Sequence, residues 1–99
     1  PIGCGMEVQF SKRAVKFLKK LDAPTTERVR QKILQLHSIL EADGIIPFTE
    51  LDIKKLKGQW EGYFRLRVGQ IRVIFTLVNN EIEILLIYDI GFRGNIYEK

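Results

Sequence analysis

The sequence predicts a single α+β domain, with an antiparallel β-sheet of about four strands and an N-terminal helical hairpin packed on one face. Two features of its patterning predict this class. Apolar residues recur at helical spacing over residues 12–42 and later alternate with polar residues, as in strands, over residues 63–89. The length of 99 residues allows one hydrophobic core but not two.

The helical pattern lies in the N-terminal half. Residues 7–10 indicate a short strand, and Ser11 is a favourable N-cap for a helix over residues 12–21. The Asp-Ala-Pro of residues 22–24 is expected to break that helix, and a second helix is expected over residues 25–42. The short connection predicts an antiparallel hairpin. The apolar stripes consist of Ala14, Val15, Leu18 and Leu21 in the first helix and Val29, Ile33, Leu36 and Leu40 in the second.

The strand pattern occupies the C-terminal half. Residues 44–53 are expected to be irregular, because Pro47 opposes regular structure. The pair Asn79-Asn80 suits the positive φ angles of a tight turn between strands. The expected strands cover residues 63–68, 71–78 and 81–89, with a further short strand after Gly91.

Arginines interrupt an otherwise buried pattern in the stretch YFRLRVGQIRVIF, residues 63–75. With a two-residue period, Arg65 and Arg67 fall on one face of a strand, and Arg72 stands between apolar residues of the next. Either this face is simply solvated, or it meets a partner that carries many negative charges. The residues on the opposite face are Phe64, Leu66 and Val68, followed by Ile71, Val73 and Phe75.

The distribution of charge favours a polyanionic partner. The chain has 16 Lys and Arg against 12 Asp and Glu, a net charge of +4, which alone is unremarkable for a small domain. Residues 54–72, however, contain six basic residues and one acid, Glu61. Lys54, Lys55 and Lys57 are either phosphate contacts or part of a solvated turn.

Several site classes are excluded by composition. The only cysteine, Cys4, lies in residues 1–5, which we interpret as an expression scar before a domain of residues 6–99. That domain would have no thiol, which excludes disulfides, cysteine nucleophiles and cysteine–metal sites. The longest apolar stretch, residues 84–88, is too short for a membrane span, and Met6 does not open a signal peptide. A cytoplasmic protein is expected.

Two single side chains have competing interpretations. The lone His37 has no second ligand for a metal site and is expected to be structural. Trp60 could stack on a nucleotide, but a tryptophan at the edge of a hairpin more often packs on the core.

The order of elements, the Lys-Leu-Lys-Gly of residues 55–58 and the Arg-x-Arg-Val-Gly-x-x-Arg-Val-x-Phe of residues 65–75 resemble the RelE/ParE toxin superfamily of toxin–antitoxin systems. The resemblance covers nearly all of residues 6–99. RelE-like members bind the ribosomal decoding site and cut messenger RNA there, whereas ParE-like members poison DNA gyrase and cut nothing. The resemblance implies a RelE-like fold.

The resemblance to RelE-like members implies a ribosome-dependent endoribonuclease that needs no metal ion or other cofactor. In those members, basic residues on two neighbouring strands, a C-terminal arginine and a tyrosine surround the scissile phosphate. Phe92 stands where many relatives have a lysine or histidine. The matching catalytic positions are Arg65, Arg67, Arg72, Arg93 and Tyr97, with Lys54, Lys55 and Lys57 as RNA-binding residues.

These residue types suit RNA cleavage in which the 2′-oxygen attacks the adjacent phosphorus. The planar fork of arginine binds phosphate oxygens bidentately and stabilises the charge that builds on them. Tyr97 could act as a general base if nearby cations lower its pKa, or could stack on a base.

The resemblance also implies partners: the ribosome with its messenger RNA, and a cognate antitoxin protein. No membrane partner is expected, and the toxin alone is expected to be a monomer. The main alternative is a ParE-like gyrase poison without nuclease activity, and a plain RNA-binding module is a third hypothesis. Arg93 and Tyr97 together favour the nuclease, because a gyrase binder needs no phosphate-facing tyrosine.

Overall fold

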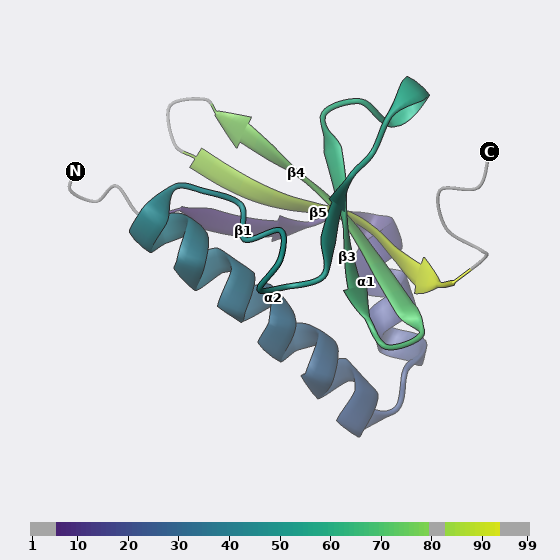
Figure 1. The fold of residues 1–99 in the computed structure, drawn as a ribbon. Coiled ribbons are helices and arrows are strands. Elements are labelled where there is room, and N and C mark those ends of the chain that lie inside the picture. Colours follow the sequence, from purple (N-terminus) through teal and green to yellow (C-terminus); the bar gives the residue numbers. More distant parts are fainter. Residues whose placement is uncertain (1–5, 80–82, 94–99) are drawn as a thin grey trace.

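Two helices lie on one face of a five-stranded sheet in a computed structural model of the protein, which describes residues 6–79 and 83–93 (Figure 1). The strands are ordered β1-β5-β4-β3-β2 across the sheet. In chain order the elements are β1 (Glu7–Phe10), α1 (Lys12–Lys20), α2 (Ala23–Asp43), β2 (Ile53–Lys55), the 3-10 turn η1 (Gly58–Trp60), β3 (Tyr63–Val68), β4 (Ile71–Asn79) and β5 (Glu83–Phe92).

The α+β class is confirmed, but the sheet is mixed and has five strands rather than about four. β2 to β5 pair in antiparallel fashion, whereas β1 runs parallel to β5, with Val8 opposite Leu85. No hairpin joins β1 to β5, so no tight turn dictates an antiparallel pairing there. β2 begins at Ile53, the last residue of the segment expected to be irregular, and β5 continues through Gly91 to Phe92. Asn80 lies outside the described residues.

Capping side chains set the helix boundaries. Ser11 caps α1 as expected, and its hydroxyl accepts a hydrogen bond from the backbone N–H of Ala14 at 3.1 Å. Asp22 caps α2, which therefore begins at Ala23 rather than Thr25. The side-chain hydrogen bond from Thr25 is the main reason why the pKa of the Asp22 carboxyl lies below its ordinary value.

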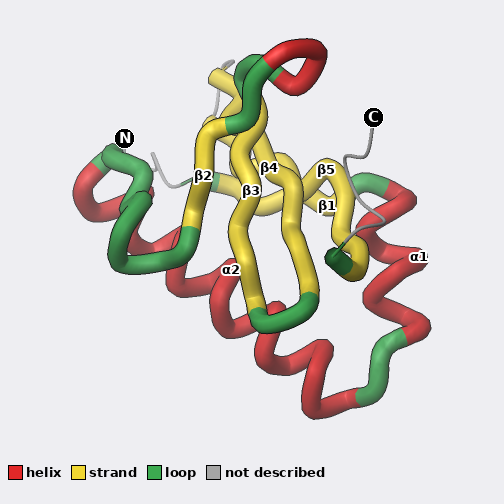
Figure 2. The backbone as a smooth tube through the Cα atoms, turned by 45° about the vertical axis from the view of Figure 1, so that its right-hand side comes forward, coloured by secondary structure: helices red, strands yellow, loops and turns green. Residues whose placement is uncertain are grey.

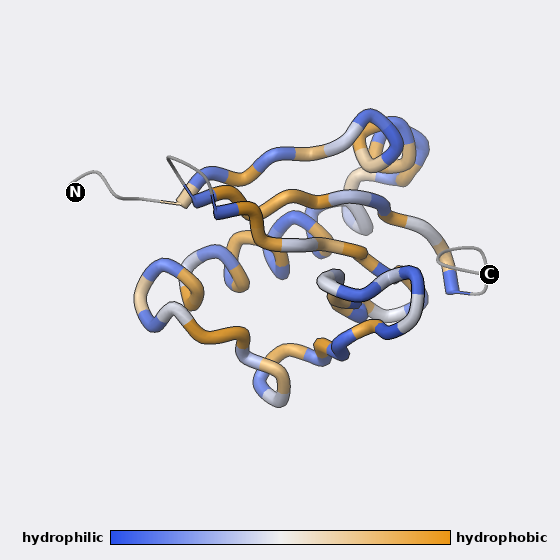
Figure 3. The backbone as a smooth tube through the Cα atoms, turned by 90° about the horizontal axis from the view of Figure 1, so that it is seen from above, coloured by the Kyte–Doolittle hydropathy of each residue, from blue (hydrophilic) through white to orange (hydrophobic). Residues whose placement is uncertain are grey.

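The core lies between the helices and one face of the sheet. The expected α2 stripe is buried, whereas Val15 of α1 is 38% exposed and Phe17 packs against the core in its place. Figure 3 shows hydrophobic and hydrophilic residues alternating along the coiled segments of the two helices. The fully buried side chains of this core include Ala14, Val29, Leu36, Leu66, Val73, Phe75, Leu85 and Ile87.

The two helices diverge from the 20–23 connection like the arms of a V, with α1 alongside β5 and α2 crossing the sheet (Figure 2). Both contribute to the same core, so both cover the same face. The opposite face carries no α-helix in the described part of the chain. Neither α1 nor α2 combines the length and the apolar character that crossing a membrane requires.

Ser11 ties the start of α1 to the sheet, because its hydroxyl also donates to the backbone carbonyl of Tyr88 in β5. We expect Ser11→Ala to lower the free energy of unfolding by about 1 kcal/mol, the usual cost of losing an N-cap. Urea titration followed by circular dichroism would measure the change. Ser38→Ala, at an exposed position within α2, is the matched control and should change it little; equal losses in both variants would contradict the capping role.

Candidate functional site

Four basic side chains gather on the side of the sheet away from the helices, which we call the arginine face: Lys54 of β2, Arg65 and Arg67 of β3, and Arg72 of β4. Lys54 lies opposite Arg65, and Arg67 opposite Arg72, in the strand register. The alternation predicted from the sequence is confirmed, because Leu66 and Val68 are buried in the core on the other side. Cross-strand pairing brings these cations into one cluster.

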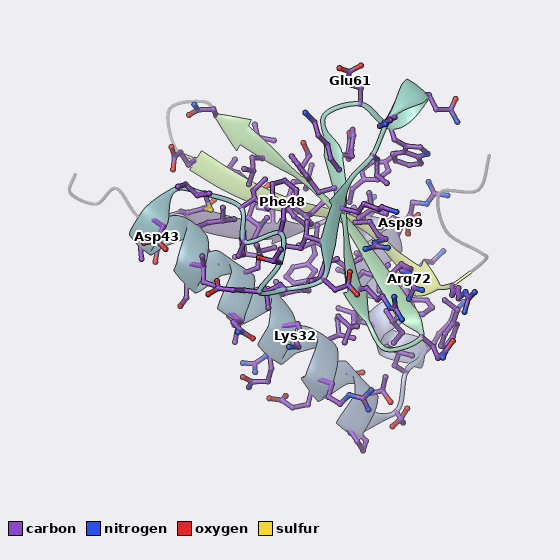
Figure 4. The ribbon with its side chains drawn as sticks, viewed as in Figure 1. Lys32, Asp43, Phe48, Glu61, Arg72 and Asp89 are labelled. Atoms are coloured by element: carbon purple, nitrogen blue, oxygen red, sulfur yellow. The ribbon has the colours of Figure 1, made fainter. Side chains whose placement is uncertain are left out.

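Arg72 is the most buried member of the arginine face, with 7% of its surface exposed. Its Nη1 donates to the backbone carbonyls of Gly69 at 2.9 Å and Ile71 at 3.3 Å. Within residues 6–79 and 83–93 it forms no ion pair with a carboxylate. Asp89 pairs with Ile74, two residues along β4 from Arg72, and so lies on the same side of the sheet, but its carboxylate is 3.9 Å from Arg13 of α1 instead. Both side chains, those of Arg72 and Asp89, are labelled in Figure 4. A buried cation held by backbone dipoles alone is a strong attractor for an anion.

Arg65 and Arg67 share one carboxylate. Asp52, in the turn before β2, lies 3.0 Å from Nη2 of Arg65 and 3.5 Å from Nη1 of Arg67. The Nε of Arg65 is buried without a hydrogen-bond partner in the described structure. An oxyanion with several oxygens could satisfy more of these donors than Asp52 does.

Two further arginines, Arg28 and Arg93, lie near the turn between β3 and β4. Gly69 has a φ of 61°, and a Cβ at this position would lie 3.2 Å from Nη2 of Arg28 in α2. The backbone N–H of Arg93, just after β5, donates to the carbonyl of Gln70 at 2.8 Å. The turn therefore brings the predicted Arg93 close to the strand that carries Arg72.

The other predicted residues lie in different places. Lys55 is exposed but follows Lys54 in β2 and so points to the other side of the sheet, whereas Lys57 is exposed in the loop before η1. Tyr97 lies outside the described residues. The structure thus assembles Arg65, Arg67, Arg72 and Lys54, with Arg93 near the same turn; the functional roles of all these residues stay predictions.

The sequence does not single out Asp52 or Arg28, and for Trp60 it favours packing on the core over stacking on a nucleotide. Asp52 and Arg28 lie in a turn and on an exposed helix face, where charged residues carry no pattern. Trp60 does not pack on the main core; its ring contacts Tyr63 and Tyr88 at centroid distances of 5.5 and 5.8 Å. Among the described residues, no group of three or more His, Cys, Asp or Glu side chains could hold a metal ion.

The chain matches a known protein family over almost its whole length. Residues 8–97 match the family described as the ParE toxin of the type II toxin–antitoxin system parDE. The chain belongs to this toxin family. No sequence match was found among curated proteins.

Solved structures place this family member in the wider RelE/ParE superfamily. The archaeal RelE–RelB complex of Pyrococcus horikoshii contains a chain that is 29% identical, with a TM-score of 0.62, and the match covers 91% of this chain and 97% of that one. A RelB–RelE complex from Methanococcus jannaschii gives 29% identity and a TM-score of 0.64, covering 91% and 95%. The YoeB/ParE toxin of Agrobacterium tumefaciens, at 19% identity and a TM-score of 0.68 over 89% and 99%, shares the fold. The predicted superfamily is confirmed.

Proposed function

We propose that this toxin cuts messenger RNA in the decoding site of the ribosome, without a metal ion, and so inhibits translation in the cytoplasm. The observation that carries the proposal is the convergence of Arg65, Arg67 and Arg72 from two neighbouring strands, on the face that no described α-helix covers. Arginines grouped in this way suit a phosphate whose charge increases in the transition state. The RelE chains at 29% identity add support for a RelE-like activity.

In the proposed reaction, the ribose 2′-oxygen loses its proton and bonds to the adjacent phosphorus, while the bond from phosphorus to the 5′-oxygen breaks. The leaving 5′-oxygen takes up a proton. Arg65, Arg67 and Arg72 would stabilise the phosphate oxygens, and Arg93 would contribute a further cation. Tyr97 would either accept the proton or stack on a base. The ribosome would hold the message in line for attack, which an arginine cluster alone cannot do.

A cognate antitoxin is the second partner that we infer. Both archaeal relatives were solved as complexes of RelE with RelB. The +4 net charge and the arginine face favour an antitoxin with acidic segments, because charge complementarity speeds association and selects the partner.

A gyrase poison without nuclease activity remains the second candidate, favoured by the match to the family named for ParE. Primer extension on cellular messages after induction separates the two functions. We expect discrete cuts within codons for the parental chain and none for Arg72→Ala as the matched control. Intact messages accompanied by DNA breaks would contradict the nuclease activity and support the gyrase poison. If induction causes neither growth arrest nor cuts in messages, the result would support the third hypothesis, a plain RNA-binding module.

A further inference from the structure

Beside the arginines, an aromatic cluster occupies the same side of the sheet. Trp60 of η1, Tyr63 of β3 and Tyr88 of β5 contact one another edge to face, with ring centroids 5.3 to 5.8 Å apart. Tyr63 lies two residues before Arg65 in β3, so the two side chains point to the same side. We call these three side chains the aromatic triad. None of the three belongs to the main hydrophobic core.

A shift in the strand register directs Tyr88 toward the other two members of the triad, Trp60 and Tyr63. Ile74 pairs with Asp89 while the next residue, Phe75, pairs with Ile87, so Tyr88 is the extra residue of a β-bulge. Ile87 is buried in the core on the helix side. Bulges of this kind redirect a side chain that regular alternation would place elsewhere. The contacts of Tyr88 with Trp60 and Tyr63 put its ring on the arginine face.

The loop that carries Trp60 is shaped by glycines. It rises beyond the sheet in Figure 1, with Glu61 at its outer end in Figure 4. Gly58 and Gly62 have φ angles of 67° and 92°, which favour glycine. The carbonyl of Gly62 accepts a hydrogen bond from the Thr76 hydroxyl at 2.7 Å, which fixes the loop to β4. This backbone holds Trp60 over the sheet.

A purely structural role, in which the three rings only shield this face of the sheet from water, does not account for the aromatic triad. The indole N–H of Trp60 is buried without an acceptor in the described part of the chain, which is unfavourable for stability. All three rings are only half-buried, so part of their aromatic surface faces solvent beside the cations. Local features that reduce stability without evident compensation concentrate at functional sites.

We propose that the aromatic triad is a stacking subsite for one unpaired nucleobase of RNA, whose phosphate lies against Arg65 and its neighbours. The inference rests on the proposed function, and it adds a base-binding element to a site that otherwise recognises only phosphate. Tyr63 and Arg65 are about 7 Å apart along the strand, a separation that one nucleotide can span. Single-stranded RNA is commonly bound by cations that contact phosphates beside aromatic rings that stack on bases.

The single tryptophan of the chain makes the subsite directly observable. The probe is a 2′-O-methylated oligoadenosine, which cannot be cleaved by 2′-oxygen attack, titrated into the free toxin at low salt. We expect saturable quenching of the Trp60 emission. An oligomer of equal length with abasic sites, which keeps the phosphates, should bind about tenfold more weakly and quench little.

Variants separate stacking from folding. Trp60→Ala should bind the oligoadenosine about tenfold more weakly by fluorescence anisotropy, with an unchanged salt dependence because no charge is lost. It should bind the abasic oligomer as the parental toxin does, an equality that a misfolded variant would not show. Trp60→Phe should recover much of the affinity. The control Phe10→Ala, an exposed aromatic residue on β1, should bind normally.

Equal binding of the base-containing and abasic oligomers, unquenched emission at saturation, or no binding by the parental toxin would overturn the subsite. Quenching in a toxin that leaves messages intact would uphold the subsite and refute the proposed nuclease. Cut messages together with unquenched Trp60 emission would uphold the proposed nuclease and refute the subsite. The two proposals therefore fail separately.

Discussion

Replacing Arg72 with alanine should lower the single-turnover rate of messenger cleavage on saturating ribosomes by about 10²-fold or more. Arg72 is 7% exposed, and the carbonyls of Gly69 and Ile71 hold its Nη1. A guanidinium has five N–H donors, so these two carbonyls leave others for phosphate oxygens. Ribosome affinity should change little, because a group that acts chiefly in the transition state affects the rate more than ground-state binding.

Two further variants define what Arg72 contributes. Arg72→Lys keeps the charge but not the planar fork, and should cleave nearly as slowly as Arg72→Ala. Lys55→Ala should do the opposite, weakening ribosome binding and reducing its salt dependence by about one unit, with little rate loss at saturation. Melting temperatures of all three variants control for folding. A parental rate for folded Arg72→Ala on saturating ribosomes would show that the arginine face only binds.

The helices could be predicted from local signals in the sequence. Ser11 and the apolar spacing fixed the start of α1 correctly. Asp22 and Pro24 indicate a break after the first helix, yet an acidic cap followed by proline is also the signature of a helix start. The V-shaped arrangement could not be predicted, because it depends on how each helix packs on the sheet.

The sheet was predicted less completely, because its outer pairings are not local. β2 has only the three residues Ile53–Lys55, too few for a period of two to be recognised. The parallel pairing of β1 with β5 joins segments from opposite ends of the chain. Nothing within Glu7–Phe10 specifies that neighbour.

The arginine face could be predicted because alternation along a strand fixes its side with certainty. Its surroundings could not, because they depend on departures from regular geometry. A β-bulge brings Tyr88 onto this face, and a loop shaped by glycines brings Trp60 onto it. The ion pairs of Asp52 arise because the turn before β2 runs alongside β3, where the backbone N–H of Arg67 donates to the Asp52 carbonyl. One acid in a polar turn gives no sequence signal.

Asp52 should be a competitor of RNA for the arginine face. Its two carboxylate oxygens lie 3.0 Å from Arg65 and 3.5 Å from Arg67, where phosphate oxygens would otherwise bind. A bound phosphate must therefore displace Asp52 or leave both guanidinium groups partly occupied. The Asp52 side chain is 54% exposed, so each ion pair is worth at most about 1 kcal/mol.

Replacing Asp52 with asparagine should therefore raise the affinity for the 2′-O-methylated oligoadenosine about tenfold at low salt, since two weak ion pairs no longer oppose binding. Fluorescence anisotropy over a salt series measures the change, which should shrink as salt screens the charges. Glu50→Gln is the matched control, because it removes an equal charge from the same turn at a residue without an ion pair among the described residues. It should raise affinity twofold at most, on the order expected for weak exposed charges. An equal gain in affinity for both variants would show that Asp52 acts only through the net charge of the protein. Loss of messenger cleavage by Asp52→Asn at unchanged affinity would instead place Asp52 among the groups that take part in the reaction.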